Sequence, residues 1–205
     1  MLKNILFNRA KDPRNYRWFY TSKGKLVVGG KSDEQNELVL KNFLKPSYTV
    51  MHTSKPGSGF MIIQDSNPSK KDLDECAVFC GCFSKQWKNL KSASSKIDID
   101  IFEGKDIYKD KSMKTGCFGV KSTKKTVKIN PGLILIIQKG KLRAVPKFED
   151  VKKNGFEILG EIKPGKLSKE EASEKIAKNI KDKFDFPVSK EEIMQAIPSG
   201  KIMVK

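Results

Sequence analysis

Short β-rich runs alternate with helical segments along this chain, and the alternation constrains the fold more than any other feature. Residues 16–22 and 25–30 are rich in aromatic and β-branched side chains, and Lys23 and Gly24 between them predict a β-hairpin. Further strands are predicted at 48–53, 59–64 and 96–102. Residues 117–122 and 124–130 are predicted to form a second hairpin, and residues 133–146 a third, with Lys139 and Gly140 at its turn. Strand pairs interrupted by helices predict an α+β fold, a mixed sheet of hairpins with two packed helices.

A helix is predicted over residues 32–44, and it accounts for an acidic cluster in a basic chain. Ser32 is a good N-cap, and Gln35 three residues later completes the S-x-x-Q pattern of a capping box. Asp33 and Glu34 then fall in the first turn, where carboxylates favour the positive end of the helix dipole. The cluster is therefore interpreted as a helix start, in preference to an acidic active site or a metal loop. The remaining alternative is that a polar side chain here, Asn36, also contacts a ligand.

A second helix is predicted after Ser69, which forms another capping pattern with Asp72. Apolar and small residues then recur at helical spacing, at Leu73, Cys76, Ala77, Cys80, Ser84 and Trp87. Cys76 and Cys80 are expected on the buried face, because free cysteine behaves as a small apolar residue. No metal site is expected, since the C-x3-C-x-C pattern has no matching second pair and His52 is the only histidine.

The basic charge is concentrated in the first part of the chain. The sequence holds 41 lysines and arginines against 24 acidic residues, a net charge of +17, of which residues 1–146 carry +15 and residues 147–205 carry +2. The second part has two more capping patterns, beginning at Ser168 and at Ser189, and each opens a short helix. We therefore predict two domains, a binding domain at 1–146 and a small helical C-terminal extension of unassigned role at 147–205.

This charge indicates an anionic partner, of which nucleic acid is the usual one. The lysines gather in two stretches. One is Lys85, Lys88 and Lys91 at the end of the second predicted helix, and the other holds eight lysines between residues 105 and 128. Lysine contacts phosphate groups well but reads no base sequence by itself. Some of these lysines serve solubility alone, but the excess in residues 1–146 is larger than solubility requires.

Signals for catalysis are scarce. The sequence has no phosphate-binding loop, no zinc-protease motif and no nucleophile elbow. His52 is interpreted as a strand-end residue that forms local hydrogen bonds or contacts a phosphate, in preference to a catalytic base. Asp98 and Asp100 share one face of a strand, and their alternation with isoleucine indicates a solvated face. Neither a cofactor nor an enzymatic activity is expected.

The sequence also bears on the cellular location. It begins with no secretory signal, and its longest aliphatic run, residues 133–137, is far shorter than the roughly 20 residues that a membrane span needs. The cysteines form a poor disulfide framework, because three of the four lie within residues 76–82. We expect a cytoplasmic protein with reduced thiols and no membrane contact. The sequence gives no indication of the oligomeric state.

Four segments, in order, resemble the NFACT-R domain, also called DUF814. "YRWFYTSKGKLVVGG" followed by "QNE" is similar to the family's aromatic opening and first helix. "VMHTSKPGSGFMII" is similar to its strand–loop–strand with a histidine before a glycine-serine loop. "AVFCGCFSKQW" looks like its helix with a late serine and tryptophan, and "KDKSMKTGCFGV" looks like its basic turn. The resemblance covers roughly residues 10–135.

The resemblance implies an RNA-binding domain of mixed α/β structure. In full-length relatives of the Rqc and NEMF type, which act in ribosome quality control, this domain helps to bind tRNA and the large ribosomal subunit. The expected partners are therefore tRNA or ribosomal RNA, with the large subunit as a candidate site of action in translation. Residues 1–146 would be a standalone form, since the other NFACT domains are absent from this sequence. Pro56 stands where relatives often carry a second histidine.

The resemblance also implies a set of site residues. Those carried over from the family's motifs are Arg17, Asn36, His52, Ser58, Lys111 and Lys114. Phosphate contacts are also expected from Lys55, Lys85, Lys88, Lys91, Lys121, Lys124 and Lys125. Two alternatives stay open. One is a DNA-binding or scaffold protein outside translation, and the other is a nucleic-acid-processing enzyme with His52 as its imidazole.

Overall fold

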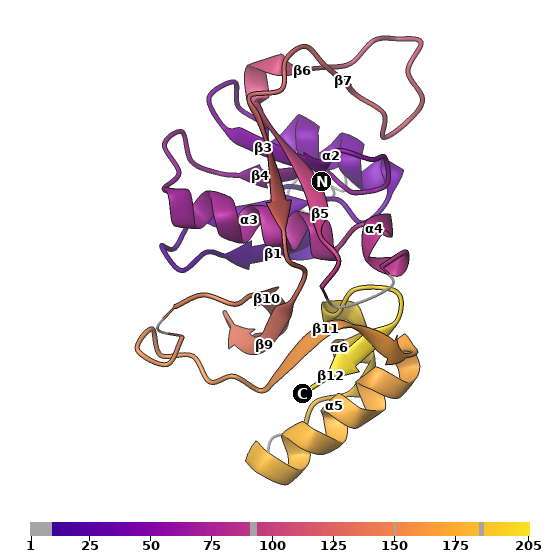
Figure 1. The fold of residues 1–205 in the computed structure, drawn as a ribbon. Helices are drawn as coiled ribbons and strands as arrows, with labels where there is room; N and C mark the ends of the chain where they lie inside the picture. The colour runs from indigo at the N-terminus through magenta and orange to yellow at the C-terminus, as the bar shows by residue number, and fades with distance from the viewer. Residues whose placement is uncertain (1–9, 91–93, 150, 185–186) are drawn as a thin grey trace, which may run out of the picture.

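The computed structural model describes residues 10–90, 94–149, 151–184 and 187–205 (Figure 1). Two antiparallel sheets, of six and four strands, and the helices packed on them make up most of this part of the chain. The two short strands β6 (Ile107–Tyr108) and β7 (Gly119–Val120) pair only with each other. The predicted α+β class is confirmed.

The larger sheet has the strand order β1-β2-β4-β3-β5-β8, and each neighbouring pair is antiparallel. Its strands are β1 (Arg17–Tyr20), β2 (Leu26–Gly29), β3 (Thr49–Thr53), β4 (Met61–Ile63), β5 (Ile97–Glu103) and β8 (Lys125–Ile129). The hairpin of β1 and β2 is confirmed, and β3 pairs with β4. A short 3-10 helix, η1 (Pro13–Asn15), precedes β1, and another, η2 (Gly104–Asp106), follows β5.

One long helix packs on each face of this sheet. Successive side chains of a strand point to opposite faces. Trp18 of β1 therefore packs in the same cluster as Val39 and Leu40 of α2 (Asp33–Phe43), whereas Phe19 packs with residues of α3 (Lys70–Cys82). The short helix α4 (Lys85–Lys88) follows α3 directly. This arrangement brings the first residue of β1, the start of α2 and the start of α4 to the same end of the sheet.

Helix α2 begins where it was predicted to begin, although its capping box is only half formed. Ser32 is the N-cap, and its Oγ accepts a hydrogen bond from the Gln35 N–H at 3.3 Å. The Gln35 side chain accepts from the N–H of Lys31 and not from that of Ser32. Ser32 Oγ donates to the Glu34 carboxylate at 2.7 Å. The acidic residues of the first turn thus stabilise the helix start, as the sequence indicated.

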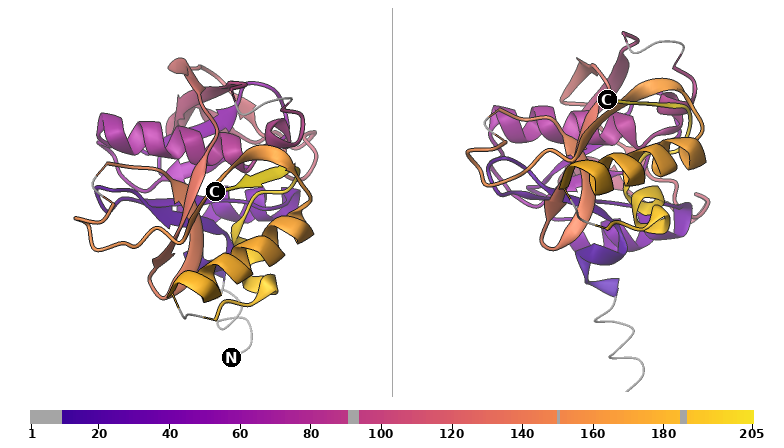
Figure 2. Two further views of the ribbon diagram at one scale, coloured as in Figure 1. Left: turned by 60° about the horizontal axis from the view of Figure 1, so that its bottom comes forward. Right: turned by 90° about the horizontal axis from the view of Figure 1, so that it is seen from below.

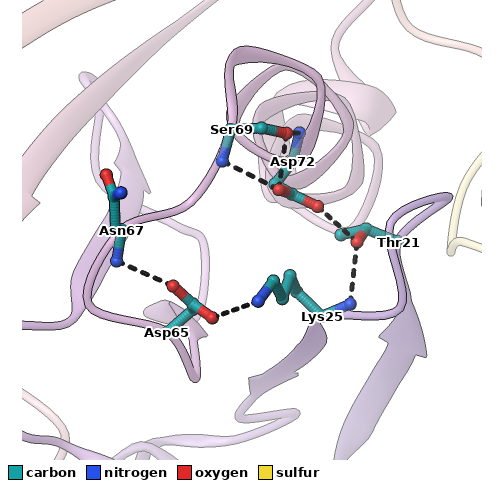
Figure 3. A network of polar contacts seen from close by, with 6 residues as sticks. All are labelled: Thr21, Lys25, Asp65, Asn67, Ser69 and Asp72. Carbon is teal, nitrogen blue, oxygen red and sulfur yellow. Dashed lines mark hydrogen bonds and ion pairs between the residues drawn. The ribbon is translucent and has the colours of Figure 1, made fainter.

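A complete capping box starts α3, and it also ties this helix to the first hairpin (Figure 3). The Asp72 carboxylate accepts from the Ser69 N–H at 2.8 Å and from the Thr21 hydroxyl in the β1–β2 turn. Thr21 Oγ1 in turn accepts from the Lys25 N–H at 3.0 Å, and the Lys25 ammonium pairs with Asp65. A buried carboxylate with several donors is well satisfied. The network therefore fixes the position of α3 relative to β1 and β2.

The predicted burial of the α3 cysteines is confirmed. Cys76, Cys80 and Cys82 are fully buried, and all four cysteines are free thiols, with Cys117 exposed. Burial raises the pKa of the three buried thiols, that of Cys80 to about 12. A thiol in this state is a poor nucleophile, so these residues serve packing.

The smaller sheet has the strand order β10-β9-β11-β12. Its strands are β9 (Leu133–Gln138), β10 (Lys141–Pro146), β11 (Gly160–Leu167) and β12 (Ile202–Val204). The β9–β10 hairpin is confirmed, with positive φ angles of 52° at Lys139 and 71° at Gly140, as a type I′ turn requires. Two helices follow β11, and they are α5 (Lys169–Phe184) and α6 (Lys190–Ala196).

This sheet crosses the predicted domain boundary at residue 146, because β9 pairs with β10 on one edge and with β11 on the other. The C-terminal extension is therefore not purely helical. Its strand β11 contains Pro164 and Gly165, which are typical of loops, and its register with β12 shifts between Pro164 and Leu167. Because these residues interrupt the strand pattern, no strand was predicted at this place in the sequence. Division of the chain into two domains stays a prediction.

Strand β9 lies between two hydrophobic layers, which explains its unbroken aliphatic run. Ile134 and Ile136 pack in the cluster that contains α3, whereas Leu133 and Leu135 pack with the apolar residues of α5 and α6. Figure 2 shows α3 and α5 on opposite sides of these strands. The two parts of the chain thus share their core across β9.

The predicted hairpin of residues 117–122 and 124–130 is wrong. Strand β7 pairs with β6, and β8 pairs with β5, where Lys128 lies opposite Asp98 and Thr126 opposite Asp100. Thr126 Oγ1 donates to the Asp100 carboxylate at 2.6 Å, so Asp100 has a partner on the next strand. These cross-strand polar pairs favour β8 as the neighbour of β5. A long-range partner of this kind is not visible in a local pattern.

Within the described part of the chain, no helix is long and apolar enough to cross a membrane. The same residues contain no cluster of three or more His, Cys, Asp or Glu side chains placed to hold a metal ion.

Candidate nucleic-acid interface

Five of the predicted site residues meet in one hollow, called here the basic pocket. Its volume is about 240 Å³, and it is lined by Arg17, Gly30, Lys31, Ser32, Asp33, Asn36, Gly57, Ser58, Gly59, Phe83, Ser84, Lys85, Lys88 and Ser199. Arg17 comes from β1, Asn36 from α2, Ser58 from the β3–β4 loop, and Lys85 and Lys88 from α4. The pocket thus gathers residues that are up to about 70 positions apart in the family-like region.

Asn36 lies at the inner wall of the pocket, in space that two glycines leave open. It is 6% exposed, and its Oδ1 is buried without a hydrogen-bond partner. A Cβ atom at Gly30 would overlap Asn36 Oδ1, and one at Gly59 would lie 2.6 Å from the Gly30 carbonyl oxygen. The two glycines are therefore required for the close approach of the β2–α2 turn and the β3–β4 loop. A buried polar atom without a partner is unusual, and such atoms occur where a ligand supplies the missing contact.

The β3–β4 loop is held over the pocket by hydrogen bonds on both sides. Ser58 Oγ accepts from the Thr53 N–H at 3.0 Å, and the His52 Nε2 lies 3.1 Å from the Ser58 carbonyl oxygen. On the α4 side, the Lys85 N–H donates to the Gly57 carbonyl at 2.7 Å. Gly57 has a φ of +120°, a conformation that side chains rarely adopt, and the Lys85 side chain packs against it. The loop therefore carries Ser58 to a fixed place.

His52 supports this loop and does not line the pocket. Its Nδ1 lies 2.7 Å from the Thr53 carbonyl oxygen, its Nε2 faces Ser58, and its ring lies 4.8 Å from that of Phe60. Burial lowers the pKa of His52, and the two carbonyl contacts oppose this shift. Because both ring nitrogens face main-chain carbonyls, the imidazole has no free atom to act as a general base.

Arg17 is the central cation of the pocket. Its guanidinium stacks over the Phe83 ring at 4.4 Å from the centroid. Burial and the nearby Arg143 lower the pKa of Arg17 to about 10, so that it stays charged at neutral pH. Among the described residues, no carboxylate lies within ion-pair distance of this guanidinium. An unpaired, largely desolvated cation is costly, and an anionic ligand would relieve the cost.

Lys31 is a pocket residue that the sequence analysis missed. It follows the two glycines at the end of β2 and immediately precedes the N-cap of α2. Partial burial lowers the pKa of its ammonium, and so do Arg17 and Arg143. Its Nζ reaches the Asn15 carbonyl at 3.4 Å. Its position directly after Gly29 and Gly30 could have indicated a site residue, because a glycine pair marks a place where two backbone segments approach each other closely.

The lining of the pocket favours an anion. It combines four cationic side chains with one carboxylate, that of the exposed Asp33. Guanidinium and ammonium groups are the side chains that bind phosphate oxygens most often. The arrangement is therefore suited to binding phosphate groups.

The other predicted lysines that the structure describes do not line the pocket. Lys55 is exposed on the β3–β4 loop, and Lys111 and Lys114 are exposed on the loop between β6 and β7. Lys121, Lys124 and Lys125 are exposed at or near the edge strand β8, and Lys124 pairs with Glu103 at 3.1 Å. Lys91 lies outside the described residues. These positions stay predictions as contacts to RNA.

The β6–β7 loop reaches the rim of the pocket through α2. The Glu37 carboxylate pairs with the Lys109 ammonium and accepts from the Gly116 N–H at 3.0 Å. Gly116, with a φ of +76°, lies against Asp33, and Asp33 lines the pocket. Glu37 therefore has a structural partner, and the loop that carries Lys111 and Lys114 is fixed beside the first turn of α2.

Comparisons with known proteins bear on the family of this chain. The sequence profile of the NFACT protein RNA binding domain matches residues 15–122, which is more than half of the chain. The archaeal Rqc2 homolog aRqcH of Methanocaldococcus jannaschii is 25% identical over 209 residues, covering 97% of this chain and 30% of that protein. The human ribosome quality control complex subunit NEMF is 29% identical over 77 residues, covering 35% of this chain and 7% of that protein.

A solved structure shows the same fold. It is the C-terminal part of the fibronectin/fibrinogen-binding protein from Streptococcus suis, with a TM-score of 0.50 and 23% identity, covering 57% of this chain and 45% of that chain. This chain spans less than a third of the length of either curated relative, and the archaeal match extends into residues 147–205, for which the sequence analysis found no resemblance. With the profile match over residues 15–122 and the four motifs in order, the chain belongs to the family of the NFACT protein RNA binding domain.

Proposed function

We propose that this protein binds RNA through its backbone phosphates, with the basic pocket as the principal contact. The observation that carries the proposal is the Arg17 guanidinium, which is charged and has no carboxylate partner among the described residues. Lys31, Lys85 and Lys88 surround it, and the Asn36 amide offers a further polar group at the inner wall. A desolvated cation binds a phosphate more strongly than an exposed one, because less water must be displaced and screening is weaker.

The RNA we propose is tRNA or ribosomal RNA, and the setting is translation, with contact to the large ribosomal subunit during ribosome quality control. Family membership and the names of the archaeal and human relatives support this setting. The protein would act as a binding module without catalysis. The support for that part is His52, whose two ring nitrogens both face carbonyl oxygens.

Equilibrium binding to labelled tRNA and to duplex DNA of the same length tests the proposal. We expect RNA affinity to fall steeply between about 50 and 200 mM salt, because each phosphate contact releases counterions, with a log–log slope of about −0.7 to −0.9 per contact. The end-labelled tRNA should stay intact during long incubation with or without divalent metal. Sequencing of the RNA that co-purifies with the protein at low salt then identifies the species.

Three results would contradict the proposal. A flat salt dependence would exclude phosphate contacts as the source of affinity. Tighter binding to duplex DNA than to any RNA would favour the DNA-binding alternative. Cleavage of tRNA by wild type but not by His52→Ala would favour the enzyme alternative, because a general base contributes to the rate far more than to binding.

A further inference from the structure

The C-terminal part of the chain reaches the basic pocket. The C-terminal unit is defined here as β11, α5, α6 and β12, residues 160–205 apart from 185 and 186. Its residue Ser199 lines the pocket, and a Cβ on the next residue, Gly200, would lie 3.2 Å from Lys88 and Trp87 of α4. Figure 1 shows α4 next to the C-terminal unit. The turn before β12 therefore packs directly against the helix that supplies two of the pocket lysines.

Lys169, the first residue of α5, adds another cation at this place. The residue is half-buried, and no carboxylate lies within ion-pair distance of its ammonium among the described residues. Burial lowers the pKa of Lys169, and so do the nearby charges of Arg17 and Lys88, with Glu170 opposing the shift. Lys169 does not line the pocket itself, but the end of β11 brings it next to the turn before β12. Leu167 lies opposite Ile202, and the Gly165 N–H donates to the Lys201 carbonyl at 3.2 Å.

The core fixes this position. Ala172, Ile176 and Ile180 on one face of α5 are buried in the cluster that contains β9 and β12. At its start, Ser168 and Glu171 form a reciprocal pair of hydrogen bonds, of 2.6 and 3.1 Å, between side chain and main chain. Movement of Lys169 away from the pocket would require the helix to leave its core. The cation is therefore held in place next to the turn that packs against Lys88.

Stability does not explain a lysine at this position. A positive charge at the N-terminus of a helix is unfavourable, because the helix dipole is positive there. Two further cations nearby make the position more unfavourable still. A lysine that costs stability and has no ion-pair partner is expected where an anion binds.

We propose that the C-terminal unit forms one wall of the basic pocket, and that Lys169 binds the same run of phosphates as Arg17 and Lys88. The inference rests on the proposed function and deepens it, because it assigns a role to a part of the chain outside the matched residues 15–122. It also replaces the expectation from net charge that residues 1–146 alone carry the binding surface. Residues 147–205 carry a net charge of only +2, but the position of one of their lysines, Lys169, matters more than this total.

The test uses the full chain with Lys169→Gln, and Lys175→Gln is the matched control. Lys175 lies on the same helix and is exposed. Lys169→Gln should weaken binding of a labelled single-stranded RNA by about three- to tenfold and lower the salt slope by about one contact, whereas Lys175→Gln should leave both unchanged. Lys169→Arg should keep the affinity of wild type, since it keeps the positive charge.

A melting experiment separates binding from folding. Without an anion, Lys169→Gln should melt at the same temperature as Lys175→Gln or higher, because a charge is removed from the helix N-terminus. Inorganic phosphate should raise the melting temperature of wild type and of Lys175→Gln, and it should raise that of Lys169→Gln and Lys88→Gln less.

The outcomes distinguish this inference from the proposed function. If Lys169→Gln matches Lys175→Gln in RNA affinity and in its response to phosphate, the inference is wrong. If wild type binds no RNA but phosphate still stabilises it through Lys88 and Lys169, the shared pocket is supported and the proposed function fails. If neither RNA nor phosphate has an effect on wild type, both are wrong.

Discussion

Two regions of this molecule are rich in cations, and they differ in what surrounds the charge. The lysine stretch between residues 105 and 128 holds eight lysines, which is the strongest local signal in the sequence. In the structure, Lys105 and Lys124 both pair with Glu103, and Lys109 pairs with Glu37. The basic pocket holds fewer cations, but they converge on one hollow that has a single carboxylate in its lining.

This difference teaches that the number of lysines in a segment does not locate a binding site. An exposed lysine beside a carboxylate is screened and hydrated, and its pairing contributes little energy. A cation that is partly desolvated and lacks a partner raises the free energy of the folded protein until an anion binds. Arg17 is in the second state, as its lowered pKa of about 10 indicates.

The largest expected effect is on RNA affinity when the charge of Arg17 is removed. Arg17→Gln should weaken binding by about tenfold to a hundredfold, because a hydrogen bond to a charged group is worth about 1.5–3 kcal/mol. Lys125→Gln, on the exposed edge strand, should change affinity by about twofold or less. Equilibrium titrations at one salt concentration make the comparison. Equal losses in the two variants would show that the cations act as one diffuse field, and the distinction between the regions would fail.

The next effect is on stability, at a residue that lines the pocket without a role in binding. Ser32→Ala removes the N-cap of α2 and should lower the free energy of unfolding by about 0.5–2 kcal/mol. RNA affinity of the folded protein should be unchanged, because Ser32 Oγ is occupied by Gln35 and Glu34. Chemical denaturation measures the first quantity and titration the second. A loss of affinity without a loss of stability would assign Ser32 to the binding surface.

A smaller effect is expected on the salt dependence of binding. Lys88→Gln should lower the log–log slope by about 0.7 for single-stranded RNA, the amount of one phosphate contact. Lys114→Gln, on the β6–β7 loop, makes the comparison, and it should lower the slope by less than Lys88→Gln because Lys114 does not line the pocket. Titration at several salt concentrations gives both slopes. If the loop variant lowers the slope and the α4 variant does not, the RNA follows the lysine stretch and the pocket assignment is reversed.

The smallest effect is a pH dependence of stability at the edge of the pocket. Burial lowers the pKa of His52 below its ordinary value of 6.5, so the folded protein favours the neutral ring. The unfolded chain then binds the proton more readily, and stability is complete above the ordinary pKa and falls as the pH drops below it. His52→Gln should remove this part of the pH dependence, as melting temperatures measured across that window would show. An unchanged pH dependence in the variant would assign it to other groups.

Much of the local structure was predictable, because its signals are short-range. Ser32 and Ser69 mark the starts of α2 and α3, and both helices begin there. The Lys139-Gly140 turn between β9 and β10 was equally clear. In each case, the residues that decide the conformation lie within a few positions of one another, so a propensity or a cap is enough.

The pairing of distant strands was not predictable in the same way. Strand β8 was assigned to β7 on the basis of proximity in the chain, and it pairs with β5. Strand β11 was missed because Pro164 and Gly165 interrupt its pattern. A strand partner is chosen by packing and cross-strand contacts that form only in the folded state, and these contacts override local preference.

The sequence by itself determined the α+β class, the helix starts, the buried cysteines and the family. It also named Arg17 and Asn36 as candidate site residues. Only the tertiary structure decided which cations share a site. It placed Lys31, Lys85 and Lys88 in one hollow with Arg17, and it packed the turn at Gly200 against Lys88. It left Lys105 and Lys124 beside Glu103, and Lys109 beside Glu37. The physical reason is that burial and ion pairing depend on distance in space, and the electrostatic effect of a charge changes with its surroundings far more than with its place in the chain.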